Sequence, residues 1–361
     1  MNLELGLNGM GKSSFIQALL ALRQSDQLQY GTLRLNGKYV KIGTTKDALY
    51  QYSKKDDGLS IGIKFKNANF HTMNFNYKID ADVFQNKDIK DGYSDGGLEG
   101  IKTQSLFNNN FQYLNANRDA PKSIYSKSYT NVVTDNNLGI NGEFTAHYIE
   151  THGNDDIIFS NLLHKDSTTK DLTTGKDIIN NTLINQVNLW MGEISPGINI
   201  RTTSISSEYV LLEYVYKQPN YGNTNRYKPE NVGFGITYGL PVVTALLTAR
   251  PNQLIIIENP ESHIHPRGQA ELGRLIAKTA MNDVQIIIET HSDHVLNGIR
   301  VAVKEADISK DKIAIFYYDK VVDASEQYTK VTDIQIDKHG TLSEYPDNLL
   351  DEWSNQLSKL L

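Results

Sequence analysis

The pattern of apolar and polar positions predicts a strand, a loop and a helix at the start of the chain. Residues 1–7 have the apolar pattern of a strand that runs into a glycine turn, and residues 12–23 have apolar side chains at helical spacing. From residue 31 to residue 77 the pattern alternates and is rich in turn residues, with Asn36-Gly37 as a hairpin signal. We therefore expect a small antiparallel sheet after the first helix.

The middle of the chain carries weaker signals. Residues 80–170 are rich in Asn, Asp, Gly, Ser and Thr and have only short apolar runs, which is typical of a subdomain with exposed loops. Residues 177–194 have the spacing of an amphipathic helix with Ile178 and Ile179 on its inner side, and residues 209–216 have the pattern of a strand.

The last third of the chain alternates between strands and helices. Buried strands are predicted at residues 253–257, 284–288 and 313–318, and helices at residues 240–249, 269–279 and 295–305. Apolar strands separated by helices of this length indicate a mostly parallel sheet that is covered on both faces. The expected fold class is therefore α/β, with flanking helices, a small antiparallel lobe and an inserted subdomain.

These zones give the expected domain organisation. Residues 1–80 would form an N-terminal lobe, residues 81–225 an inserted subdomain and residues 226–361 a C-terminal lobe. Residues 346–361 have the pattern of an acidic amphipathic helix, which we expect to pack against the protein as a terminal helix.

Composition narrows the possible classes of protein. With 39% hydrophobic and 22% charged residues the chain is ordinary for a globular protein, and the absence of cysteine excludes disulfides, thiolate metal sites and cysteine catalysis. No run approaches the roughly 18 apolar residues that a membrane span needs, and the N-terminus lacks a secretory signal. We expect a cytoplasmic protein that does not contact a membrane.

The strongest chemical signal is a phosphate-loop (Walker A) motif between the first strand and the first helix. It consists of Gly6, Leu7, Asn8, Gly9, Met10, Gly11, Lys12, Ser13 and Ser14. Glycines at this spacing let backbone N–H groups surround a triphosphate at a helix N-terminus. Lys12 would add charge at the outer phosphates, and the Ser13 hydroxyl is suited to hold Mg²⁺. An ordinary glycine-rich turn is disfavoured by the complete spacing.

Two later strands end in groups that suit phosphate chemistry. The apolar strand that ends at Glu258 resembles a Walker B segment, in which Glu258 could hold Mg²⁺ through water, and Glu261 follows three residues later. The strand before Thr290 and His291 is also apolar. An imidazole at that place can hydrogen-bond a terminal phosphate or the attacking water.

The order of these motifs resembles that of an ABC-type ATPase head. A glycine-containing segment at residues 231–238 lies between the phosphate loop and Glu258, and residues 263–266 and 290–292 follow. The succession is most similar to bacterial AAA-family ATPases related to the SMC and OLD families, whose phosphate loop is close to GxNGxGKSS. In this comparison residues 263–266 stand in the place of the D-loop.

The resemblance implies roles for further residues. Gly233 and Gly235 would present a helix N-terminus to the γ-phosphate bound by a second subunit, so the implied active form is a homodimer that closes around ATP and Mg²⁺. His291 would be the switch histidine. Gln112 or Arg118 would contact the nucleotide region.

Two features depart from the pattern of these relatives. They have one or two strands before the phosphate loop, whereas only residues 1–5 precede Gly6 here. Asn259 stands where they carry the catalytic glutamate, and an amide cannot accept a proton from the attacking water. We therefore expect slow ATP hydrolysis, with Glu258 or Glu261 as the base that remains.

Other functions remain open. A metallohydrolase would use the potential ligands His263, His265, His291, Asp293 and His294. A nucleotide-binding scaffold with little hydrolysis would dock an effector protein through the inserted subdomain. The net charge of −6 provides no general attraction for DNA, so DNA contact would need a local patch. The resemblance implies a role in antiviral defence or DNA repair.

Overall fold

The computed structural model describes residues 1–25, 31–53, 58–64, 70–87, 101–171, 173–218 and 222–360. Contacts divide the chain into two compact units. The first unit comprises Met1–Met10, Asn110–Asp319 and Lys330–Leu361, and the second comprises Gly11–Asn109 and Lys320–Thr329. The segments 1–80, 81–225 and 226–361 expected from composition do not coincide with these units, and as separate modules they stay a prediction.

The largest sheet among the described residues has six strands. Their order is β16 (Gln327–Ile334), β15 (Ala314–Val322), β1 (Asn2–Gly6), β14 (Gln285–Glu289), β13 (Leu254–Glu258) and β6 (Phe111–Leu114). The pairs from β15 through β6 are all parallel. Helices α6 (Pro266–Ala280) and α7 (Asp293–Lys304) connect β13, β14 and β15 in turn. The predicted α/β class with a mostly parallel sheet is confirmed.

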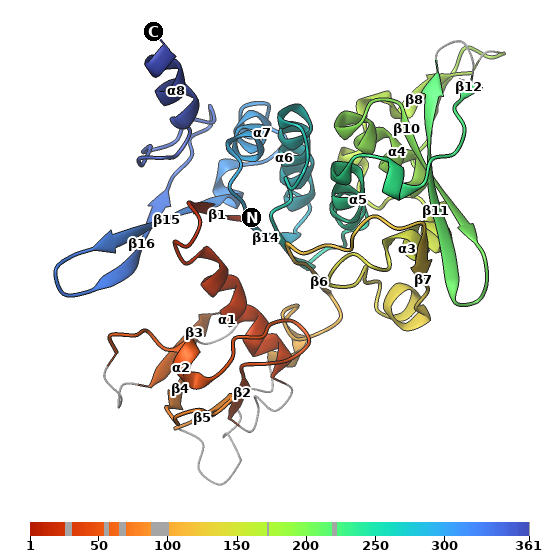
Figure 1. Ribbon diagram of the computed structural model, residues 1–361. Coiled ribbons are helices and arrows are strands. Elements are labelled where there is room, and N and C mark those ends of the chain that lie inside the picture. Colours follow the sequence, from red (N-terminus) through yellow and green to blue (C-terminus); the bar gives the residue numbers. More distant parts are fainter. Residues whose placement is uncertain are drawn as a thin grey trace. The chain divides into compact units, whose positions relative to one another are not determined.

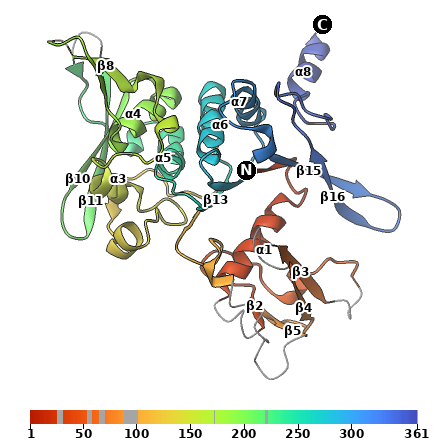
Figure 2. The ribbon, with the colours of Figure 1, turned by 180° about the vertical axis from the view of Figure 1, so that it is seen from behind.

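The apolar runs of the central strands follow from burial. Leu254, Ile255, Ile256 and Ile257 of β13 are all buried, as expected for a parallel strand that is covered on both faces. Helices α6 and α7 lie side by side in Figures 1 and 2, and α6 meets α7 through glycines. A Cβ atom at Gly298 would overlap the Ala270 carbonyl group, so this close crossing requires glycine.

The rest of the first unit combines helices with a second, antiparallel sheet (Figure 2). Its helices are α3 (Thr145–His152), α4 (Leu183–Ile194), α5 (Phe234–Leu247) and α8 (Glu352–Leu360). Its smaller strands are β7 (Ile124–Ser126), β8 (Thr168–Lys170), β9 (Asp177–Ile179), β10 (Ile198–Ser204), β11 (Tyr209–Gln218) and β12 (Gly222–Asn223). Strand β11 pairs with β10, β12 and β7, which confirms the strand predicted at residues 209–216.

The helix predicted at residues 177–194 is wrong in its first part. Residues Asp177–Ile179 form β9, paired with β8, and the helix begins only at Leu183. The Asn180 side chain accepts hydrogen bonds from the backbone N–H and the hydroxyl of Thr182, and this turn separates the two elements. Ile178 and Ile179 are 49% and 56% exposed, so they do not face the core as predicted.

The second unit holds the first helix and the predicted small sheet. Helix α1 (Lys12–Gln24) is followed by β2 (Thr32–Arg34), α2 (Thr45–Ala48), β3 (Leu59–Lys64), β4 (Phe70–Asn76) and β5 (Val83–Asn86). The strands form one antiparallel sheet in the order β2-β5-β4-β3, whose core includes Leu33, Phe75 and Phe84. At the predicted hairpin, Asn36 and Lys41 form an isolated antiparallel β-bridge, as expected.

Short helical turns complete the structure. They are Ile101–Thr103, Thr130–Thr134, Ser160–Leu162, Lys165–Ser167, Pro229–Asn231 and Lys310–Lys312. None of the described helices is long and apolar enough to cross a bilayer. The terminal helix α8 has no buried residue, and Trp353 on it is 76% exposed, so the prediction that this helix packs against the protein is wrong.

Candidate functional site

The phosphate loop has the backbone that its glycines predict. Gly6, Gly9 and Gly11 have φ angles of 136°, 76° and 97°, a region that favours glycine. A Cβ atom at Gly6 would overlap the carbonyl oxygen of Tyr318 on the neighbouring strand. Helix α1 begins at Lys12 with no side-chain cap and no acidic residue in its first turn, so the positive end of its dipole suits an anion.

Three glutamates lie in register across adjacent strands of the first unit. Glu4 on β1 pairs with Glu289 on β14, and Glu289 pairs with Glu258 on β13. Residues in register on parallel neighbours point to the same face of a sheet, so these carboxyl groups form a row at the carboxyl ends of the strands. Glu258 and Glu289 each end an apolar strand, whereas Glu4 lies in the middle of β1, and only Glu258 was predicted as a site residue.

Burial raises the pKa of two members of this row, Glu4 and Glu258. Burial raises the pKa of Glu4 to about 7; the nearby Glu289 carboxylate raises it further and the Tyr318 hydroxyl opposes the rise. The pKa of Glu258 is also raised, mainly by burial, and hydrogen bonds from Tyr113 and Ala116 reduce the effect. A divalent cation at this row would favour the ionised carboxylates.

Glu258 is held in a fixed orientation by groups from the end of β6. The Tyr113 hydroxyl donates to Oε1 at 2.9 Å, and the Ala116 backbone N–H donates to Oε2 at 3.1 Å. Each carboxylate oxygen retains a second lone pair, and hard oxygen ligands are those that Mg²⁺ prefers. Glu258 therefore fits the predicted role in holding Mg²⁺ through water.

Arg118 supports the backbone of the segment after β13. Its side chain is buried, and its guanidinium donates to the carbonyl oxygens of Glu258 at 2.7 Å and Asn259 at 3.1 Å. Burial lowers its pKa to about 10, so it stays charged at neutral pH. Gln112 instead donates to Gly139 and accepts from the Leu138 N–H, contacts that hold neighbouring backbone segments together.

Asn259 adopts a left-handed backbone conformation, with a φ of 44°. Its N–H donates to the Glu289 carbonyl oxygen at 2.8 Å, which joins the ends of β13 and β14. Asparagine enters this region far more readily than most residues. The backbone thus gives a physical reason for asparagine where relatives are expected to carry glutamate.

Glu261 connects the end of β13 to the end of β14. Its Oε2 accepts the Thr290 hydroxyl at 2.8 Å, and its Oε1 accepts the backbone N–H of His291 at 2.9 Å. The Thr290 oxygen also accepts the N–H of Ser292 at 3.0 Å. The structure therefore brings Glu261 and His291 together through the His291 backbone, a contact that the sequence did not predict.

The glycine-containing segment 231–238 forms the start of α5. Gly233 is the N-cap, and a Cβ atom at Gly235 would overlap the His263 carbonyl group, so this segment packs against the predicted D-loop. The rings of Phe234 and Tyr238 lie 5.7 Å and 4.9 Å from that of His263. The N-terminus of α5 is thus displayed beside residues 263–266.

The histidines do not assemble a metal site. Within the described part of the chain, no group of three or more His, Cys, Asp or Glu side chains could hold a metal ion. His265 Nδ1 instead accepts the N–H of Arg267 and caps α6. The described residues therefore give no support to the metallohydrolase interpretation.

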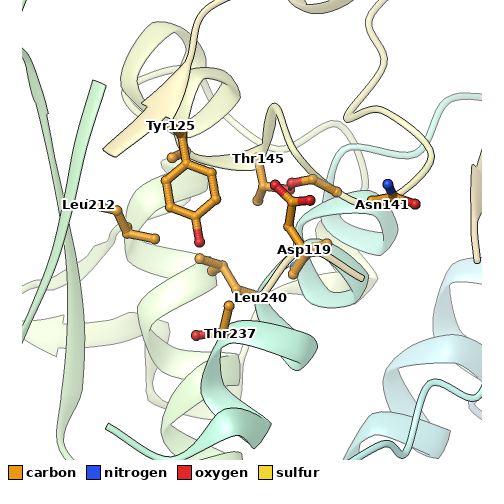
Figure 3. A pocket seen from close by; sticks show the side chains of 10 residues that line it. Asp119, Tyr125, Asn141, Thr145, Leu212, Thr237 and Leu240 are labelled. Carbon is orange, nitrogen blue, oxygen red and sulfur yellow. The ribbon is translucent and has the colours of Figure 1, made fainter. Parts of the chain in front are cut away.

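A small cavity lies beneath the start of α5. Its volume is about 10 Å³, roughly the space that one water molecule needs. Figure 3 shows Asp119, Tyr125 and Thr237 around it. The cavity is far too small for a nucleotide, so we place no nucleotide there.

The fold and the phosphate loop define the chain as a P-loop ATPase domain that binds nucleotide. The chain belongs to the family described as "AAA domain, putative AbiEii toxin, Type IV TA system", whose model matches residues 5–297. A second family model, "Protein of unknown function (DUF3696)", matches residues 308–360. No curated protein matches the chain. The predicted membership of an AAA family of P-loop ATPases is confirmed.

Similar solved structures are SMC heads. The SMC head bound to the C-winged helix domain of ScpA is 13% identical, with 92% of this chain and 90% of that chain covered and a TM-score of 0.46. The SMC head domain from Thermotoga maritima is 11% identical, with coverage of 93% and 90% and a TM-score of 0.39. An SMC head with an extended coiled coil, bound to the C-terminal domain of ScpA derived from Pyrococcus furiosus, is 12% identical, with coverage of 100% and 93% and a TM-score of 0.46.

Proposed function

We propose that the chain binds ATP with Mg²⁺ at its phosphate loop and works as a switch that dimerises around the nucleotide. The observation that carries the proposal is the position of Gly6, which ends β1 at the sheet edge where Glu289 and Glu258 end β14 and β13. In parallel α/β sheets, ligands bind at the carboxyl ends of the strands.

Each residue of the loop has a defined task in this proposal. The backbone N–H groups around Gly6, Asn8, Gly9 and Gly11 surround the phosphates, and Lys12 neutralises their outer charge. Ser13 and Ser14 lie in the first turn of α1, where the helix dipole favours an anion. The ligands that we propose for Mg²⁺ are the Ser13 hydroxyl and the Glu258 carboxylate, and the ion would supply positive charge at the phosphate oxygens.

The second half of the site comes from another copy of the chain. Gly233 caps α5 with no side-chain hydrogen bond, and α5 has no acidic residue in its first turn. Such a helix end favours the γ-phosphate of a nucleotide that is bound by the partner. The expected assembly is a symmetric homodimer with two shared sites.

Hydrolysis in this dimer is slow. Asn259 has no proton-accepting carboxylate, and losing a general base costs roughly 10²- to 10⁴-fold in rate. Glu258 is the carboxylate left to act as base, and Mg²⁺ held by it would lower its affinity for a proton. A long-lived, ATP-closed dimer suits a switch in antiviral defence or DNA repair.

The test is ATP and Mg²⁺ binding combined with sedimentation and phosphate release. We expect ATP-dependent dimers in the wild type, and loss of both binding and dimers in Lys12→Ala. Lys46→Ala is the matched control, because Lys46 is exposed on α2. A wild-type chain that does not bind ATP, or a Lys12→Ala variant that binds as well as wild type, would contradict the proposal.

A second candidate is a nucleotide-binding scaffold that docks an effector protein. The exposed helix α8 favours it, since an amphipathic helix with Trp353, Leu357 and Leu360 in solvent gains stability when a partner covers them. ATP binding without phosphate release above background, measured in the same samples, would favour this scaffold over the ATPase.

A further inference from the structure

The Glu261 side chain hydrogen-bonds the segment after β13 to the segment after β14. Its two carboxylate oxygens are used by different donors of that second segment, the Thr290 hydroxyl at 2.8 Å and the His291 N–H at 2.9 Å. Hydrogen bonds to an ionised carboxylate are about twice as strong as those between neutral groups. A single side chain therefore fixes both the residue before the imidazole and the backbone that carries it.

These hydrogen bonds continue into helix α7. The Thr290 oxygen that donates to Glu261 also accepts the Ser292 N–H at 3.0 Å, and the Ser292 hydroxyl in turn caps α7 through His294 and Val295. Ser292 also donates to Gln269 of α6 at 2.5 Å. The orientation of residues 290–292 is thus fixed by Glu261 on one side and by two helices on the other.

The other end of the Glu261 segment is fixed as well. Asn259 donates from its backbone to Glu289 at 2.8 Å, and Arg118 holds the carbonyl oxygens of Glu258 and Asn259. The backbone between Glu258 and Glu261 is therefore held by the same two neighbouring segments, the end of β14 and the residues after β6.

We propose that Glu261 is a positioning residue that holds His291 in place, and that it is not the base that activates water. This inference rests on the proposed function, with His291 as the switch histidine that the resemblance to ABC-type ATPases implies. It replaces the role of reserve base that the sequence suggested for Glu261.

The two roles separate in a pair of variants. In Glu261→Gln the amide oxygen can still accept the His291 N–H, and the amide N–H₂ can donate to the Thr290 oxygen. Both hydrogen-bonded contacts are therefore kept, while the ability to accept a proton is lost. In Glu261→Ala both are lost. A positioning residue is therefore rescued by glutamine, and a base is not.

The first measurement is steady-state phosphate release with ATP and Mg²⁺ on the full chain. We expect Glu261→Gln to stay within about threefold of wild type and Glu261→Ala to lose about tenfold or more in kcat, the size of one lost hydrogen bond to a charged group. A base would instead lose roughly 10²- to 10⁴-fold in both variants. Equal, large losses in both variants would overturn the inference.

The second measurement does not depend on turnover. Amide hydrogen exchange of residues 290–292 is followed in the nucleotide-free chain. It should quicken in Glu261→Ala and stay as in wild type in Glu261→Gln and in Glu344→Ala, a control at an exposed position. Unchanged exchange in Glu261→Ala would overturn the inference even if ATP binds. Failure of ATP binding would contradict the proposed function alone.

Discussion

At the scale of single residues, the backbone of Asn259 explains more than its side chain does. A φ of 44° is a left-handed conformation, which costs most L-residues roughly 1–2 kcal/mol and which asparagine tolerates by local hydrogen bonding. The asparagine therefore fits the turn that places its N–H on Glu289. Restoring the glutamate of related ATPases at this position would strain the same turn.

We predict that Asn259→Glu destabilises the protein and does not accelerate hydrolysis. The expected loss of unfolding free energy is about 1 kcal/mol, from left-handed strain. Phosphate release should not show the roughly 10²- to 10⁴-fold gain that a newly supplied base would give. Urea unfolding and phosphate release measure the two effects. Asn252→Glu, at an exposed position with a φ of 61°, is the control for backbone strain alone. A large gain in phosphate release by Asn259→Glu would show this interpretation to be wrong.

The site residues illustrate what a sequence reveals residue by residue. Glu258 and His291 could be predicted because each follows an apolar strand, and strand ends are local signals. The alignment of Glu4 with Glu289 could not, because register between β1 and β14 joins segments that are far apart in the chain. The carbonyl contacts of Arg118 were missed for the same reason.

At the scale of elements, glycines decide how α6 and α7 meet. A Cβ atom at Gly298 would overlap the Ala270 carbonyl group, and one at Gly273 would overlap that of Val295. The two helices connect β13, β14 and β15, so their crossing also places the loops that carry Glu261 and His291. Apolar periodicity predicted both helices but gave no sign of their distance.

We predict that Gly298→Ala lowers the unfolding free energy by about 1–3 kcal/mol, because the methyl group must push the helices apart. Gly192→Ala is the matched control. Gly192 lies inside α4 with nothing within 4 Å of an added Cβ, so alanine should stabilise by about 0.5–1 kcal/mol through helix propensity. Chemical denaturation measures both, and opposite signs are expected. Equal effects would mean that the α6–α7 contact is not tight.

Two elements show where periodicity misleads. The spacing of residues 177–194 suits one helix, but the turn made by Asn180 and Thr182 ends a strand before the helix begins. The pattern of α8 is amphipathic, yet no residue of this helix is buried. Periodicity identifies an apolar face and does not say whether anything covers it.

At the scale of the whole molecule, the proposed sites are shared between two chains. The phosphate loop and the N-terminus of α5 would belong to different copies at each nucleotide. The N-terminus of α5 can be changed at Gly233 without disturbing the fold. A Cβ atom there meets nothing within 4 Å, and the φ of −62° suits any residue. Aspartate is a favourable N-cap and would repel a phosphate.

We predict that Lys12→Ala and Gly233→Asp are each inactive alone and complement one another when mixed. A mixed dimer has one site with both halves intact and can close around one ATP, so equal mixing should restore phosphate release to at most about half of the wild-type rate. Mixing two preparations of Lys12→Ala is the control. Recovery that fails, or a Gly233→Asp variant that is fully active alone, would argue that each chain works by itself.

The sequence by itself determined the phosphate loop, the alternating strands and helices, and the acidic and histidine-bearing strand ends, because each depends on residues close together in the chain. The tertiary structure alone decided the row of Glu4, Glu289 and Glu258, the support from Arg118 and the grip of Glu261 on Thr290 and His291. These contacts join distant segments, whose register and approach are set by the packing of the whole unit and not by local preference.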